Sequence, residues 1–186
     1  MSLGGPLIGY SNATIPMPLT TLHYAQGLTN KTTAFGSLHT TSLLYGVFQT
    51  DIGINQSLYY NKVYRVGFTG NPVLNMAIDR WEKKFKLWPQ LDVNAYWEIA
   101  TGKSFLYAGL SNWFELANKT SPEIQQTKHW FCNPEIGFNY TRSKWNYVLE
   151  AKYLAASINN LPNVVEYRGF GGKGAVGIYL GFNRKF

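Results

Sequence analysis

The chain reads Leu-Asp-Val-Asn-Ala-Tyr-Trp-Glu-Ile-Ala-Thr from residue 91 to residue 101. Apolar residues occupy every second position of this stretch: Leu91, Val93, Ala95, Trp97 and Ile99. Asp92, Asn94, Tyr96 and Glu98 stand between them. Because successive side chains of a β-strand point to opposite faces, this pattern predicts a strand with one apolar and one polar face.

The same alternation recurs on both sides of short turn sequences elsewhere in the chain. Beyond Gly102-Lys103 it continues through residues 104–116, so residues 91–116 read as a hairpin. Residues 134–153 repeat the design around residues 142–144, and residues 50–69 repeat it around Asn61-Lys62. Three hairpins of one kind predict an all-β, antiparallel, up-and-down sheet.

Charged residues of the predicted strands fall on the polar face. They are Asp51, Arg65, Asp92, Glu98, Glu115, Glu135, Glu150, Lys152 and Lys185. Several glycines share this face and suit a crowded interior better than a solvent face, where glycine weakens a strand without compensation. The charges therefore predict a polar network inside a transmembrane β-barrel whose apolar face meets lipid. The opposite arrangement, a soluble barrel with an apolar ligand inside, stays open.

Predicted links alternate between short and long along the chain. Short turns fall near residues 28–31, 61–62, 102–103 and 142–144, and longer links span residues 40–46, 80–90, 117–128 and 157–173. Membrane barrels carry short turns at one end and long loops at the other. With an early strand near residues 3–10, the count is about ten strands, with 8–12 allowed, in one domain of residues 1–186.

Bulk composition excludes several other classes of protein. No stretch approaches the roughly eighteen apolar residues of a membrane-spanning helix. The single cysteine, Cys132, cannot form a disulfide framework within the chain. The net charge of +7 comes without a nucleic-acid motif, so no nucleic-acid partner is expected. Residues 1–6 show no secretory signal, so export would require a leader upstream of them.

The last predicted strand, residues 175–186, ends on an aromatic residue. Val176, Ile178, Leu180 and Phe182 alternate before the terminal Phe186. This stretch resembles the C-terminal assembly signal of bacterial outer-membrane β-barrel proteins. The resemblance implies residence in the outer membrane among lipid and lipopolysaccharide, and recognition of Phe182 and Phe186 by the barrel-assembly machinery. It identifies no subfamily.

No catalytic, cofactor or metal motif stands out. The three histidines, His23, His39 and His129, lie in no recognised catalytic spacing. We therefore expect no catalytic residues, no cofactor, no metal ion and no enzymatic activity. A lipid-modifying enzyme that uses His39 or His129 at the barrel rim remains an alternative.

The preferred hypothesis is a non-enzymatic anchor, scaffold or accessory subunit that presents its long loops outward. Its contacts with lipopolysaccharide or another envelope protein are assigned to a basic and aromatic stretch: Arg80, Trp81, Lys83, Lys84, Lys86 and Trp88. Loops on a rigid barrel are natural recognition sites. A narrow pore is the alternative in which the interior charges line a conduction path instead of filling the barrel.

Overall fold

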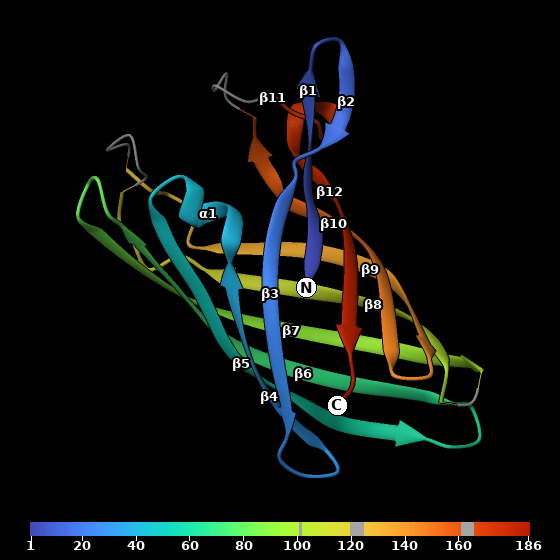
Figure 1. Ribbon diagram of the computed structural model, residues 1–186. Coiled ribbons are helices and arrows are strands. Elements are labelled where there is room, and N and C mark those ends of the chain that lie inside the picture. Colours follow the sequence, from blue (N-terminus) through green and yellow to red (C-terminus); the bar gives the residue numbers. More distant parts are fainter. Residues whose placement is uncertain (101, 120–124, 161–165) are drawn as a thin grey trace.

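The computed structural model describes residues 1–100, 102–119, 125–160 and 166–186, and ten of its strands form a closed antiparallel ring (Figure 1). Each strand pairs with its sequence neighbours, and β1 closes the ring between β12 and β3. The predicted ten-stranded antiparallel barrel is therefore confirmed. The ring consists of β1 (Ser2–Tyr10), β3 (Leu19–Gly27), β4 (Thr32–His39), β5 (Val47–Asn61), β6 (Val66–Asp79), β7 (Lys84–Ala100), β8 (Ser104–Phe114), β9 (Trp130–Arg142), β10 (Trp145–Asn159) and β12 (Lys173–Arg184).

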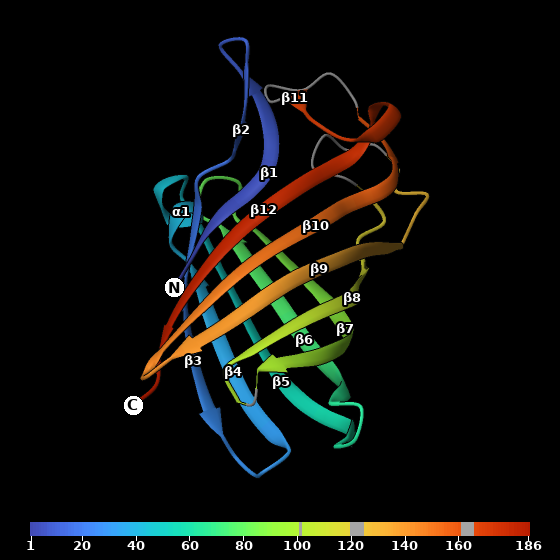
Figure 2. The ribbon, with the colours of Figure 1, turned by 90° about the vertical axis from the view of Figure 1, so that its right-hand side faces the viewer.

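The C-terminus and the short turns lie at one end of the barrel, here called the turn end, and the longer links lie at the other, the loop end. The N-terminus lies part-way along the wall, where Ser2 pairs with Thr21 and Gly181 (Figure 1). At the loop end, β2 (Ala13–Pro16) pairs with the second half of β1 as a hairpin that projects beyond the ring (Figure 2). The two-residue β11 (Glu166–Tyr167) lies against β1. The short helix α1 (Thr40–Leu44) and the 3₁₀ turn η1 (Phe170–Gly172) complete this end. In the described part of the chain, no helix is long and apolar enough to span a membrane.

One predicted link is much shorter than expected. The long loop assigned to residues 80–90 covers only residues 80–83, because β7 begins at Lys84 and pairs with β6 from Asp79 onward. Pro89 lies within the strand, opposite Leu74. The loops predicted at residues 117–128 and 157–173 extend partly outside the described residues.

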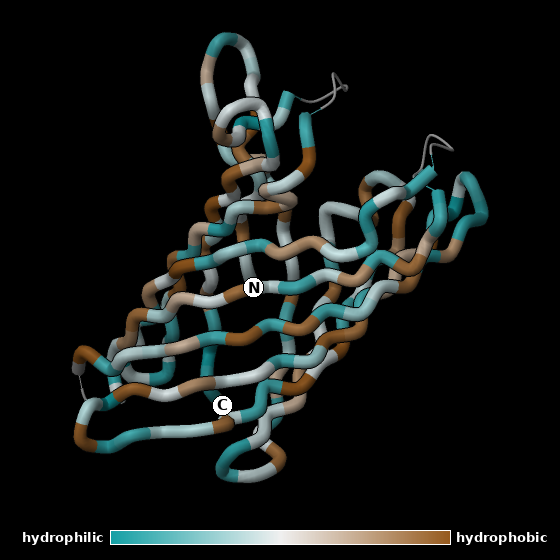
Figure 3. The backbone as a smooth tube through the Cα atoms, turned by 180° about the vertical axis from the view of Figure 1, so that it is seen from behind, coloured by the Kyte–Doolittle hydropathy of each residue, from teal (hydrophilic) through white to brown (hydrophobic). Residues whose placement is uncertain are grey.

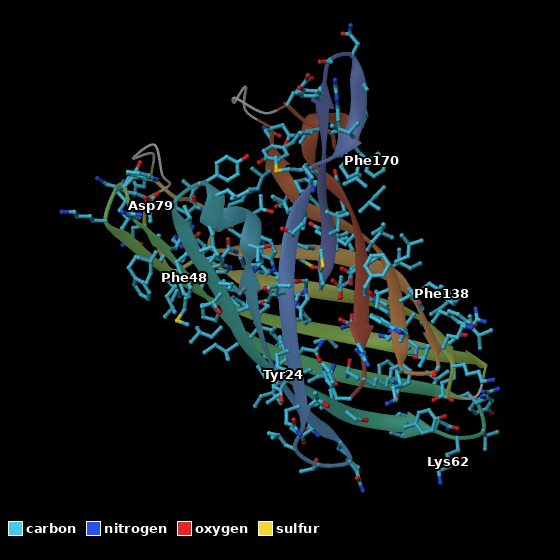
Figure 4. The ribbon with its side chains drawn as sticks, viewed as in Figure 1. Tyr24, Phe48, Lys62, Asp79, Phe138 and Phe170 are labelled. Carbon is cyan, nitrogen blue, oxygen red and sulfur yellow. The ribbon has the colours of Figure 1, made fainter. Side chains whose placement is uncertain are left out.

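Burial in this barrel is reversed relative to a water-soluble protein. Large apolar side chains cover the outside: Ile136 is 60% exposed and Leu149 is 52% exposed. Phe48 and Phe138, labelled in Figure 4, belong to the same outward set. Hydropathy alternates along the strands accordingly (Figure 3). Most of the buried side chains among the described residues are polar: Thr21, Ser37, Asn75, Ser104, Ser111, Asn133, Glu135 and Asn139. The buried apolar ones are Pro6, Val73 and Ala175.

Inside the barrel, tyrosine rings lie over glycines of the neighbouring strand. Tyr96 is directly opposite Gly67, and Tyr107 is directly opposite Gly137. A Cβ atom at either glycine would collide with the tyrosine ring. The missing side chain thus lets each ring lie flat against the wall, which explains why glycines share the polar face.

Candidate functional site

A polar chamber of about 680 Å³ occupies the barrel interior toward the turn end. Strands β5 to β10 supply most of its wall through the polar face predicted from the sequence. Six of the nine predicted interior charges line it: Asp92, Glu98, Glu135, Glu150, Lys152 and Lys185. Tyr96, Phe105 and Tyr107 add aromatic surface, and Asn55, Asn71, Asn94 and Asn139 add amides.

The chamber wall carries an ion cluster centred on Lys152. The Lys152 ammonium lies 2.7 Å from a Glu135 carboxylate oxygen and 3.3 Å from one of Glu150. The Tyr107 hydroxyl donates a 2.5 Å hydrogen bond to Glu150. Since the Glu135 side chain is only 3% exposed, Lys152 is needed to compensate its charge. One cation therefore serves two carboxylates.

The other predicted charges lie apart from this cluster. Arg65 belongs to the turn before β6, and its Nε is 3.8 Å from a Glu98 carboxylate oxygen. Asp51 lies on the opposite wall, where it accepts hydrogen bonds of 2.6 Å from Ser37 and from the imidazole of His39. Glu115 follows β8 at the loop end. The predicted network is thus divided among several separate clusters.

His39 and Ser37 do not form a nucleophile and base pair. Both point to the same Asp51 oxygen, so the Ser37 hydroxyl donates to the carboxylate instead of to the imidazole. A second histidine, His23, shares a 2.9 Å hydrogen bond with Ser2. His129 lies at the loop end, where its Nδ1 is 2.9 Å from the Glu115 carbonyl oxygen. In the described ranges, no group of acidic, histidine and cysteine side chains is placed to hold a metal ion.

The basic and aromatic stretch is divided between turn and strand. Arg80, Trp81 and Lys83 lie in the turn between β6 and β7, where the Arg80 guanidinium is 5.6 Å from the Trp81 ring centre. Lys84 starts β7 and forms a 2.8 Å ion pair with Glu82.

Lys86 and Trp88 stand on the same face of β7 as Asp92, so they point into the barrel and not outward. The Lys86 ammonium pairs with Glu115 and lies 5.7 Å from the Trp88 ring centre. Both residues therefore belong to the inner face of β7 and not to the long loop predicted for residues 80–90.

Amides and hydroxyls of the wall complete the interior and were not singled out from the sequence. Gln90 donates to Asp92 and to Ser111 over 2.8 and 3.2 Å. The fully buried Asn133 accepts a 2.7 Å hydrogen bond from the backbone N–H of Ala155, where β10 bulges. Extending the alternation of residues 91–99 back through Pro89 would have identified Gln90, Trp88 and Lys86 as inward-facing.

Comparison with known proteins supports the fold of the chain but identifies no protein family for it. No family model matches the sequence, and no curated protein matches it significantly. Among solved structures, the chain is similar to the NanC porin in a rhombohedral crystal form, with 10% identity and a TM-score of 0.51. The match covers 100% of this chain and 99% of the porin. The resemblance to outer-membrane β-barrels is thus confirmed at the level of the fold.

We predict that Lys152→Met lowers the free energy of unfolding by about 3 kcal/mol, because it leaves two carboxylates without their shared cation. The triple variant Glu135→Gln, Glu150→Gln, Lys152→Met should recover most of this loss, since no buried charge is left unpaired. Urea unfolding followed by tryptophan fluorescence measures both. A single variant as stable as the parent would show that the cluster contributes nothing.

Proposed function

We propose that the chain spans a bacterial outer membrane and gives small solutes a narrow polar path through its lumen. The reversed burial carries the first half of the proposal, because exposed Ile, Leu and Phe over the whole outer wall are stable only against lipid. Strand length agrees: β5 to β10 and β12 have 11 to 17 residues, and about 9–11 suffice to cross a bilayer at a tilt.

The chamber supports the second half of the proposal. Its polar lining and volume of about 680 Å³ suit a small hydrated solute. Polar side chains of its wall, among them Asn55, Ser57 and Asn71, can exchange hydrogen bonds with such a solute.

A non-conducting anchor or scaffold is the second candidate. The Glu135, Lys152 and Glu150 cluster fills part of the lumen, as expected for a barrel packed with its own side chains. The hairpin of β1 and β2 projects at the loop end and offers surface to another envelope protein. This candidate requires no path through the barrel.

Outside contact with lipopolysaccharide is assigned to the turn residues Arg80, Trp81 and Lys83. Trp81 is 73% exposed beside the two cations, a combination that suits anionic headgroups. The double variant Arg80→Glu, Lys83→Glu should weaken lipopolysaccharide binding several-fold in a sedimentation assay. Lys62→Glu, at the turn end, serves as the control and should change nothing. Equal binding by the parent and the double variant would remove this assignment.

Membrane insertion is tested by placing a charge on the outer wall. Leu149→Arg should lower the free energy of unfolding in lipid vesicles by about 2–4 kcal/mol, because the guanidinium would face hydrocarbon. Leu28→Arg is the matched control: Leu28 is similarly exposed at 60% but lies in a turn. In a water-soluble barrel both substitutions would be nearly neutral, and that result would contradict the proposal.

Conductance separates the two candidates. Planar bilayers containing the purified chain should show discrete, small current steps. The double variant Asp92→Asn, Glu98→Gln removes two carboxylates of the chamber and should shift the reversal potential in a salt gradient toward anions. Silent bilayers, with correctly folded protein in them, would contradict the pore and favour the scaffold.

A further inference from the structure

A second cavity opens at the loop end of the barrel interior. This mouth pocket has a volume of about 310 Å³ and is lined by Lys86, Trp88, Trp113, Glu115, Phe131 and Ala155. Its residues come from β7, β8, β9, β10 and the first position after β8. It lies nearer the loop end than the chamber, by four residues on β7 and six on β8, on the same inward faces.

The aromatic wall of the mouth pocket is built by strand register. Trp113 of β8 is directly opposite Phe131 of β9 and Gln90 of β7. The Trp113 indole N–H donates a 3.0 Å hydrogen bond to Ser111, so that side chain is held in place. Trp88 is the inward residue that precedes Gln90. Aromatic surface therefore comes from three adjacent strands.

The polar rim of the mouth pocket is also held in place. Glu115 accepts a 3.0 Å hydrogen bond from the Ala117 N–H through one oxygen and pairs with Lys86 through the other. The Lys86 ammonium lies over Trp88 at 5.7 Å. The carboxylate can accept hydrogen bonds and the ammonium can donate them, and both stand beside the aromatic faces.

Aromatic faces beside a fixed donor and acceptor suit one kind of solute. One face of a pyranose ring carries C–H groups with slight positive charge, which are attracted to the negative face of an aromatic ring. The hydroxyl groups at the ring edge both donate and accept hydrogen bonds. A quaternary cation would meet the Lys86 ammonium, and an anion would meet Glu115. The volume lies at the lower end of the range for ligand pockets, which fits a single ring.

We propose that the mouth pocket binds a neutral saccharide, with one pyranose ring against Trp88 and Trp113 and its hydroxyl groups on Lys86 and Glu115. The inference deepens the proposed pore function, on which its role as an entry site rests. Binding itself needs only the folded barrel. Binding and conduction can therefore fail independently.

The test titrates the full chain in detergent with methyl α-D-glucopyranoside and follows saturation-transfer NMR signals of the sugar. The expected result is saturable binding with a millimolar dissociation constant. Trp113→Leu and Trp88→Leu should each weaken it at least about tenfold, and Glu115→Gln should weaken it several-fold. Trp130→Leu is the matched control, because Trp130 neighbours Phe131 but is 60% exposed on the outer face. It should bind like the parent.

Folding of each variant is checked by circular dichroism and heat-dependent gel mobility, and only the tryptophan variants that fold are compared with the parent. No saturable binding by the folded parent would overturn the proposal, as would equal binding by the parent and both folded pocket variants. Tighter binding of tetramethylammonium or benzoate than of the glucoside would overturn the saccharide assignment. Sugar binding with silent bilayers would refute the pore and leave the mouth pocket standing. Conductance without sugar binding would support the pore and refute the saccharide site in the mouth pocket.

Discussion

The closure of the sheet by β1 is the constraint on which the rest of the molecule depends. β1 pairs with β12 through five residue positions and with β3 through three, which joins the first and last strands of the ring. An open sheet would leave two edges of unsatisfied N–H and C=O groups, which a lipid environment does not tolerate. Closure also turns the two faces of every strand into an inside and an outside, so alternation along the chain becomes a division between lumen and surface.

Given this division, the interior has to satisfy its polar groups with a limited set of partners. The chain does so locally instead of through one continuous network. Lys152 forms ion pairs with Glu135 and Glu150. Asp51 accepts hydrogen bonds from Ser37 and His39, and Lys86 forms an ion pair with Glu115. The spaces between these clusters are the chamber and the mouth pocket. Solutes can therefore bind in the chamber and the mouth pocket, which the ion-pair clusters do not fill.

Much of the fold was predictable because its signal is local. The period of two in residues 91–99 and the turn at Gly102-Lys103 depend on neighbours in sequence, and they gave the correct hairpin, strand count and ends of the barrel. The first half of β7 was instead predicted as a loop, although its pairing with β6 continues on both sides of Pro89.

The candidate sites were less predictable, since they depend on which strands meet across the wall. The alternation of side chains along each strand assigns Lys152, Glu135 and Glu150 to the inner face of the barrel. Only the register between β9 and β10 places them within ion-pair distance of one another. Trp88 and Trp113 are brought to one pocket by the register of β7 and β8. The hairpin of β1 and β2 was not predicted, although its turn at Ser11 and Asn12, both with positive φ, joins strands that are adjacent in sequence.

The pairing of β1 with β12 also has a consequence for how the barrel forms. Every other neighbouring pair in the ring is close in sequence, with at most one or two short elements between the two strands, whereas Ser2 meets Gly181 across nearly the whole chain. The residues that meet in this pairing are much further apart in sequence than those of any hairpin. The entropic cost of closing so long a loop is largest while the intervening strands are still disordered. Hairpins formed earlier shorten the effective loop. The pairing of β1 with β12 is thus the last contact to become favourable during folding. Because β1 is held by only five positions on the β12 side and three on the β3 side, it is also the strand expected to separate first.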